Sequence, residues 1–418
     1  MIVSLVYNMV DTYFIALTGV QELVAGVSLV APMFTLMIAF GDIFGLGGSS
    51  VISRLLGEKK DNEAKKTCAF CIWVSLVFGL CISAILLLFR TQILGLLGVS
   101  NVTYEYANAY YTWIAIGAVS IIFSMVPSNI LRTEGLAVQS MAGSIIGSIV
   151  NIIFDPIFIF GLNQGAAGAA MATVLGNIIA DIYYVYAVIK KSKRLTCSPS
   201  HMKITGRRVK DILMIGIPAS ITNIMQTFMM VMTNNFLLPY GTDKVAAMGI
   251  ALKVNMITAL VLVGFAFGGQ PLVGYNYGAK NEKRLKNILK FAYLFEIGLG
   301  LLFTIIMCIF APQIIKVFMD KPDIITNGAM MLRFQQMGMI FMSVTLISTC
   351  VCQAVGNAGG AFVLSISRQG VIYVLALLIM SNVFGYTGVL VSQACSDVVT
   401  ALIAVGIMLR IMKKFIKN

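Results

Sequence analysis

The sequence predicts an all-α integral membrane protein, with twelve transmembrane helices in two six-helix bundles. Three observations predict this fold: an apolar composition, a series of membrane-length apolar runs, and an internal repeat. Of the 418 residues, 59% are hydrophobic and 11% are charged, whereas soluble domains carry about 25% charged residues. A soluble fold must cover its outside with polar side chains, but lipid-facing helices can be apolar all round. The composition therefore excludes an ordinary soluble protein.

Twelve apolar runs are long enough to cross a bilayer, for which about 20 residues suffice. A basic linker interrupts them after the sixth run. The predicted spans are 1–18, 24–52, 68–89, 105–130, 137–161, 166–189, 211–238, 245–270, 287–310, 325–350, 361–383 and 387–412. The predicted domains are an N-terminal lobe at 1–195, a cytoplasmic linker at 196–210 and a C-terminal lobe at 211–418.

The net charge of +13 comes from Lys and Arg residues that lie mostly in alternate loops between the apolar runs. Nucleic-acid binding is one explanation of such an excess. Basic loops on one side of a membrane are, however, the usual mark of the cytoplasmic face. We therefore expect both termini in the cytoplasm, the lipid bilayer as the surrounding partner, and no nucleic-acid partner.

The second half of the chain repeats the first in the same orientation. Gly57 matches Gly278, and Gly135 matches Gly356, at one constant spacing along the sequence. Parallel six-helix repeats are a known plan of transporters, in which the substrate binds between the halves. The repeat argues against a seven-helix receptor. It also makes the first helix look clipped, because fewer residues precede Asp11 than precede the matching position in the second half.

Two intramembrane carboxylates have a polar residue one helical turn before them. Asp11 follows Tyr7, and Asp155 follows Asn151, in each case on the same helical face. Pro156 must disturb the backbone beside Asp155 and free a carbonyl group. An ionisable residue in a membrane helix costs several kcal/mol and points to a function. Both pairs are interpreted as proton or sodium sites, and the alternative is a structural hydrogen bond that fixes helix packing.

Other charged residues within the apolar runs have two explanations. Asp42 lies among glycines, and cavity lining and close helix packing explain it equally well. Asp181 and Asp397 are expected to be solvated or paired with loops. Lys253 and Arg368 each need a carboxylate, carbonyl or water partner, and structural pairing is the favoured explanation.

The seventh span contains Met225, Phe228 and Met229. Flexible methionines and aromatic rings suit a promiscuous apolar cavity, although lipid-facing side chains are an equal alternative. The single histidine, His201, lies in the linker, and the sequence has neither a zinc-protease motif nor a phosphate-binding loop. We therefore expect no enzyme activity and no cofactor.

Several stretches resemble the multidrug and toxic compound extrusion (MATE) family, and its bacterial DinF/MepA-like branch in particular. They span nearly the whole chain and read YNMVD, ELVAGVSLVAP, GLGGSSVISRLLGEKK, RTEG, NIIFDPIFIFG, GAAGAAMATVLG and QPLVGYNYGAKNEKR. The seventh-span stretch NIMQTFMMVMTNNF lacks the acidic residue that is usual in the NorM branch. The Pro early in the first helix of such families is also absent, so the bending step attributed to it does not carry over.

The resemblance implies a monomer of two pseudo-symmetric bundles around a central cavity, in a bacterial cytoplasmic membrane. It implies export of small amphipathic or cationic organic compounds in exchange for H⁺ or Na⁺. The residues that match the coupling site are Asp11, Tyr7, Asn151, Asp155 and Thr173. If Na⁺ is the ion, it is expected at Asp11, Asn151 and Asp155. The expected substrate cavity includes Asn129, Asp42, Met225, Phe228, Met229 and Lys253.

Two other functions remain open. A flippase or exporter of lipid-like substrates would be favoured by Lys253 or Arg368 facing a cavity. A receptor or scaffold that transports nothing would be favoured by a cavity without polar lining.

Overall fold

The computed structural model describes residues 10–11, 13–15, 17–318 and 321–417. Among these the secondary structure is helical throughout and contains no strand. Two compact units are present, Ile2–Ser220 and Ile221–Asn418, and each is described by itself. The boundary between them lies inside a helix, beyond the linker at which the sequence predicts the lobes to divide. That predicted division stays a prediction.

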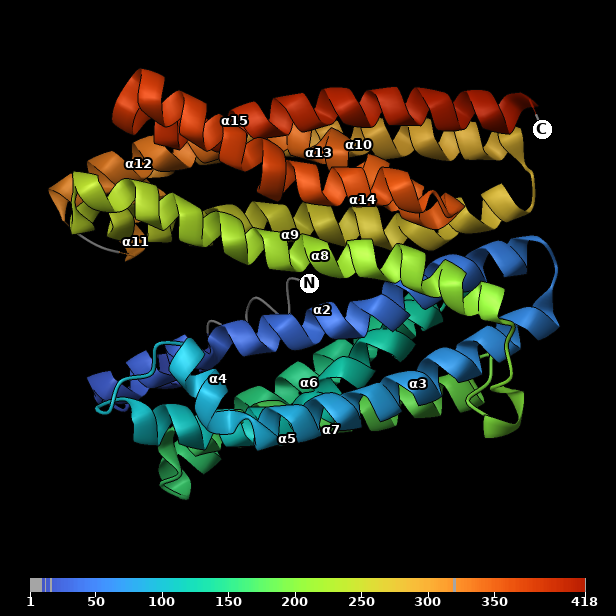
Figure 1. Cartoon of the computed structure of the whole chain (residues 1–418), viewed down its shortest axis with the longest axis horizontal. Coiled ribbons are helices and arrows are strands. Elements are labelled where there is room, and N and C mark those ends of the chain that lie inside the picture. The colour runs from blue at the N-terminus through green and yellow to red at the C-terminus, as the bar shows by residue number, and fades with distance from the viewer. Residues whose placement is uncertain (1–9, 12, 16, 319–320, 418) are drawn as a thin grey trace. The chain divides into compact units, whose positions relative to one another are not determined.

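The elements of the first unit are α2 (Gln21–Gly57), α3 (Asp61–Leu88), α4 (Arg90–Leu96), α5 (Tyr104–Thr133), α6 (Ala137–Pro156), the π-helix η1 (Ile157–Gly161), α7 (Gly165–Lys190) and the 3-10 turn η2 (Pro199–His201). Its long helices run roughly parallel or antiparallel to one another in Figure 1, and the short α4 is tilted against them. The helix α8 (Gly206–Leu237) contributes residues to both units.

The second unit continues from α8. Its elements are η3 (Leu238–Tyr240), α9 (Thr242–Gly278), α10 (Glu282–Ile309), α11 (Ala311–Phe318), α12 (Pro322–Met337), α13 (Met339–Val355), α14 (Ala358–Ile366), the π-helix η4 (Ser367–Val371) and α15 (Ile372–Lys417).

The helix lengths confirm the predicted all-α, multi-span membrane fold. Nine helices within the described residues are long and apolar enough to cross a membrane, or ten if α12 and α13 form one bent span. The run Ala358–Lys413 is 56 residues long, far more than the roughly 20 residues that one span needs. It breaks at Gly385, where φ is 57° and ψ is −129°. This run therefore contains two of the predicted spans.

The internal repeat is visible in the helix boundaries. The spacing that separates Gly57 from Gly278 also separates both ends of α2 from those of α9, and both ends of α3 from those of α10. Residues with positive φ recur at the same spacing: Lys59 (59°) matches Lys280 (53°), and Gly135 (84°) matches Gly356 (81°). A positive φ is uncommon for a lysine. Its recurrence after both α2 and α9 shows that the two units share one backbone plan down to the turns.

Glycines let the helices of the first unit approach closely. A Cβ atom on Gly176 of α7 would lie 2.5 Å from the carbonyl oxygen of Gly147 on α6. A Cβ on Gly216 of α8 would collide with the carbonyl oxygen of Ile43 on α2. Small residues at such crossings are how membrane helices pack backbone against backbone, because lipid supplies no hydrophobic force between helices.

The basic segment between α7 and α8 is packed against the rest of the first unit. The Glu134 carboxylate accepts hydrogen bonds from the Ser192 hydroxyl and from the backbone N–H groups of Lys193 (2.7 Å) and Arg194 (2.8 Å). Trp73 donates its indole N–H to the Cys197 carbonyl at 2.9 Å. Burial raises the pKa of the Cys197 thiol to about 11. This thiol therefore stays neutral at physiological pH.

Two features of the helices were not predicted. The short helices α4 and α11 follow α3 and α10 and begin at matching positions of the repeat, but they are too short to register as apolar runs. The tenth predicted span bends by 42° between α12 and α13. At this bend a Cβ on Gly338 would lie 2.5 Å from a carboxylate oxygen of Asp397. A contact with such a distant residue has no local sequence signal.

We predict that Gly176→Ala destabilises the protein, because its methyl group would collide with the Gly147 carbonyl. Overpacking of this kind costs about 1–3 kcal/mol. The measurement is the midpoint of thermal unfolding of purified protein in detergent. Gly249→Ala is the control, since nothing lies within 4 Å of the Cβ it would add. Equal midpoints for the two variants would contradict the close α6–α7 contact.

Candidate functional site

Asn151 connects two helices in the interior of the first unit. Its side-chain amide donates to Asp155 Oδ1, one turn later on α6, at 3.4 Å, and to Thr173 Oγ1 on α7 at 3.2 Å. The exposed fractions are 2% for Asn151, 0% for Asp155 and 6% for Thr173. The structure therefore brings together three of the five predicted coupling residues in one buried cluster.

The cluster has unused acceptor capacity. Asn151 Oδ1 and Asp155 Oδ2 are buried without a hydrogen-bond partner, and so is Asp11 Oδ1. Asp11 lies near enough to Asp155 for the two charges to interact. Tyr7, the fifth predicted coupling residue, lies outside the described residues. Buried acceptor oxygens without donors are costly, and a proton or a hard cation is what such a set of oxygens can bind.

Pro156 ends α6, and the backbone continues as the π-helix η1. The Leu162 N–H donates to the Ile157 carbonyl at 2.9 Å, which is the i+5 spacing of a π-turn. Proline lacks an N–H, so it removes one helical hydrogen bond and the local ladder is rearranged. The predicted disturbance beside Asp155 is therefore present.

Asn129 and Asp42 lie in another part of the first unit. Asn129 donates to the Met125 carbonyl at 2.8 Å and lies against Gly45 of α2. Asp42 interacts electrostatically with Arg132, whose guanidinium also donates to Ser140 Oγ at 3.0 Å. These contacts hold α2, α5 and α6 together. For Asp42 they support the packing alternative that the sequence left open.

Asp181 is half-buried on α7 and bonded to another helix, where the sequence analysis expected a solvated or loop-paired group. Its two carboxylate oxygens accept hydrogen bonds from the hydroxyl groups of Ser120 and Ser124 on α5. The two serines are one turn apart and so point to the same side of their helix. Their spacing is a signal that the sequence offered, but their partner on α7 could not be read from it.

The predicted cavity residues of the second unit do not share one environment. Met229 is 8% exposed and belongs to a core cluster, while Phe228 is 40% exposed. Met225 packs against Gly370 of η4. Lys253 is exposed on α9. Both Phe228 and Lys253 can therefore meet a ligand, whereas Met229 contributes to packing.

Arg368 has the structural partner that the sequence analysis favoured. Its Nε donates to Asp397 Oδ1 at 2.8 Å, and the two side chains are 17% and 1% exposed. Gln393 donates to the same carboxylate oxygen at 3.2 Å, and Ser396 donates to the Arg368 carbonyl at 2.7 Å. The pair joins η4 to α15. Asp397 is thus paired with a half-buried cation of the second unit, not with a loop.

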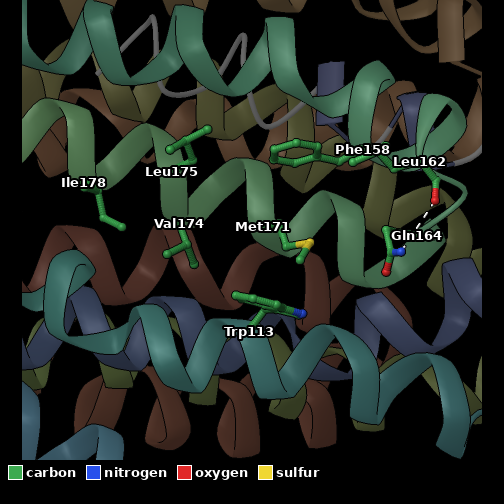
Figure 2. Close-up of a pocket in the computed structure, with 8 residues that line it drawn as sticks. All are labelled: Trp113, Phe158, Leu162, Gln164, Met171, Val174, Leu175 and Ile178. Atoms are coloured by element: carbon green, nitrogen blue, oxygen red, sulfur yellow. Dashed lines mark hydrogen bonds between the residues drawn. The ribbon is translucent and has the colours of Figure 1, made fainter.

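An apolar groove of about 360 Å³ lies on the first unit between α5, η1 and α7 (Figure 2). Its lining comprises Trp113, Phe158, Leu162, Gln164, Met171, Val174, Leu175 and Ile178. Gln164 is the one side chain in this lining with an amide, and it donates to the Leu162 carbonyl at 3.5 Å. The groove suits an apolar chain or ring. It is close to the buried cluster along the sequence, since Phe158 follows Asp155 by one turn.

Comparison with known proteins agrees with this arrangement. The model of the MatE family matches residues 1–157 and 218–379, and the chain belongs to this family. It is a multi-pass membrane transporter. The matched segments include α2 to α6 of the first unit and α9 to α13 of the second. The predicted family is confirmed.

Similar curated proteins come from staphylococci. The multidrug export protein MepA of Staphylococcus haemolyticus is 30% identical over 409 residues, which cover 97% of this chain and 89% of that protein. MepA of Staphylococcus aureus strain MSSA476 is 29% identical over 96% of this chain and 89% of its own length. Among solved structures, an outward-facing multidrug resistance MATE transporter aligns with a TM-score of 0.94 at 25% identity, over 100% of this chain and 94% of that one.

We predict that Asp397→Ala strongly destabilises the protein, because it leaves the half-buried Arg368 guanidinium without its partner inside the helix bundle. The expected cost is about 3–5 kcal/mol. Thermal unfolding in detergent measures it, and the double variant Arg368→Met/Asp397→Leu should recover most of the loss. Glu282→Gln is the control, since it removes only the exposed pair with Lys286. A loss no larger than in this control would show that the pair is not structural.

Proposed function

We propose that this chain is a secondary multidrug exporter that expels amphipathic or cationic organic compounds in exchange for H⁺ or Na⁺. The observation that carries the proposal is the buried cluster of Asn151, Asp155 and Thr173 with Asp11 beside it. Its unpartnered oxygens need a cation or a proton. The MepA relatives, named as multidrug export proteins, support the substrate class.

The cluster supplies a mechanism for coupling. When one H⁺ or Na⁺ binds at Asp11 and Asp155, it cancels one negative charge and so removes the repulsion between the two carboxylates. It also satisfies oxygens that otherwise lack partners. The side chains around the cluster then relax to a different arrangement. Coupling requires only that substrate and cation differ in their affinity for the two arrangements. Cation entry from outside thus weakens substrate binding, and cation release inside restores it.

The membrane and its orientation are also part of the proposal. Basic residues follow both α2 and α9, at Lys59, Lys60 and Lys280, and the basic linker follows α7. These segments belong on the cytoplasmic side by the positive-inside rule. We therefore place the chain in a bacterial cytoplasmic membrane as a monomer with both termini in the cytoplasm.

Asp11→Asn should abolish ion-driven export while leaving the fold intact, because the amide cannot take up a cation in place of the carboxylate. Asp155→Asn should weaken coupling, since Asn151 and Thr173 remain. Export of ethidium from proteoliposomes is measured with a pH gradient and a sodium gradient imposed separately. Whichever gradient drives wild-type export identifies the coupling ion.

The matched control for both variants is Asp323→Asn, which changes an exposed carboxylate in the first turn of α12. It should export like the wild type. Full export by Asp11→Asn would refute the assigned coupling site. Unchanged export by Asp155→Asn would leave the Asn151 cluster with a packing role alone.

A second candidate substrate class is favoured by Lys253. It is exposed on its unit, and it lies eleven residues after the start of α9 at Thr242, about 16 Å along the helix. At that depth a lysine facing lipid is costly, so such residues usually face a water-filled path. A cation there would attract the anionic head group of a lipid-like substrate.

If anionic amphiphiles are substrates, Lys253→Gln should lower their export at least tenfold and leave ethidium export unchanged or faster. Lys244→Gln is the control, because Lys244 lies on the same helix near its outer end, beside Asp243. Export of a fluorescent fatty-acid anion and of ethidium is compared in the same vesicles. Equal effects of Lys253→Gln on both compounds would exclude charge selection at this position.

A further inference from the structure

Glu296 lies at the centre of α10, fourteen residues after Glu282 and thirteen before Ile309. Each half of the helix is about 20 Å long, so the carboxyl group lies near the middle of the bilayer. The side chain is 0% exposed. Among the described residues, it is the one carboxyl group with both oxygens buried and without a hydrogen-bond partner. Glu296 is not among the site residues that the sequence analysis predicts.

The hydroxyl groups within one turn of Glu296, on α10 and on the facing α13, already donate their protons elsewhere. One turn further along α10, the Cβ position of Gly300 lies 2.7 Å from Ser343 Oγ on α13, and this hydroxyl donates to the Met339 carbonyl. One turn earlier, the hydroxyl of Tyr293 lies 2.7 Å from Ser348 Oγ. Ser348 donates to its own helix, which leaves the tyrosine proton for Ser348. None of these hydroxyl groups therefore has a free O–H to donate to a Glu296 carboxylate.

Within the part of the chain that the structure describes, no charged group is placed to neutralise Glu296. α10 packs against α9, α11, α12 and α13. On α13 the titratable neighbour is the thiol of Cys350. On α12, Arg333 donates to the Cys308 carbonyl. Cys308 follows Glu296 by twelve residues, which is about 18 Å along α10. Lys316 lies on α11 beyond the end of α10, and the cations of α9 are Lys244 and Lys253, before its middle.

A carboxylate in this place would be a buried charge without donor or counter-ion, which costs many kcal/mol. A protonated carboxyl group carries no net charge, so it costs far less to bury in this place than a carboxylate. A sodium ion would need several oxygen ligands gathered around the carboxylate, whereas neither carboxyl oxygen has a polar partner among the described residues. We propose that Glu296 is a second proton-binding site of this transporter, located within the second unit.

The repeat shows that packing does not require an acid at this position. At the spacing of the repeat the counterpart of Glu296 is Ser75 of α3, which is 0% exposed and donates to the Ile72 carbonyl at 2.9 Å. The counterpart of Gly300 is Gly79, which also lies against its neighbouring helix. One backbone arrangement thus accepts a serine in one unit and a glutamate in the other. Glu296→Ser is therefore a variant that the fold should accommodate.

The inference rests on the proposed exchange of substrate for a cation and makes it quantitative. If Asp11 with Asp155 carries one proton and Glu296 carries another, one transport cycle moves two protons. At zero membrane potential, the largest substrate concentration ratio that the transporter can hold across the membrane then equals the square of the proton concentration ratio. A tenfold proton gradient would hold about a 100-fold substrate gradient, against about tenfold for one proton.

The test measures the limiting ethidium ratio across proteoliposomes at several imposed pH gradients, with the potential clamped by potassium and valinomycin. The exponent is the power of the proton ratio that reproduces the measured ethidium ratio. It should fall by one in Glu296→Ser and stay unchanged in Glu282→Gln, the exposed glutamate of the same helix. An unchanged exponent in Glu296→Ser overturns the proposal. Loss of export in Asp11→Asn with a normal exponent for Glu296→Ser would keep the proposed function and remove only this site.

A second readout does not depend on transport. Infrared difference spectra of purified protein, recorded between low and high pH, report the C=O band of a protonated carboxyl group. The wild type should show a buried carboxyl band that Glu296→Ser lacks and Glu282→Gln retains. If wild-type vesicles export with neither gradient, the exchange mechanism fails, and this spectrum still decides whether Glu296 binds a proton. Identical spectra for wild type and Glu296→Ser overturn the site.

Discussion

The cost of an unpaired charge inside an apolar helix bundle is the constraint on which this molecule depends. Among the described residues, each unit has ionisable groups that are buried or half-buried in its helices, and some of them are matched. Arg368 lies on Asp397, and Asp181 accepts from two serines. Groups that are matched in this way hold helices together and have no proton or ion left to exchange. Within the apolar spans, Asp11, Asp155 and Glu296 have buried carboxyl oxygens without a hydrogen-bond partner. These are the groups that we propose bind and release a cation.

Close packing makes the coupling cluster possible. Gly147 and Gly176 bring α6 and α7 into backbone contact, and the Cβ position of Gly176 lies 3.3 Å from Cβ of Asn151. At this separation one short amide reaches both Asp155 and Thr173. Larger residues at either glycine would separate the helices beyond the reach of an asparagine. The same small residues that fold the first unit thus set the geometry of its polar cluster.

Much of the fold, and part of the site, could be predicted because their signals are local. Apolar length marks the spans, and the one-turn spacing of Asn151 and Asp155 places them on one helical face. Thr173 entered only through family resemblance, since it lies on the next helix, beyond the turn that follows η1. Structural pairing was favoured for Arg368, but its partner Asp397 could not be named for the same reason. Glu296 carries the same local signal as Asp11, an acid within an apolar run, and was not singled out. What the sequence could not show is that no group around it pairs with it.

The two units share a backbone but not their polar residues, and this difference bears on mechanism. Asp155 has Ala376 at its repeat position, and Glu296 has Ser75. A duplicated frame that kept the same helix ends and the same left-handed turns could have kept the same carboxylates at no packing cost. Their divergence places ion-binding chemistry at different points of the helix order in each half. A bound cation can shift the conformation of a unit only if its affinity differs between the conformations of that unit. Two dissimilar cation sites, one in each half, would therefore let one transport cycle shift both halves, each through different helices.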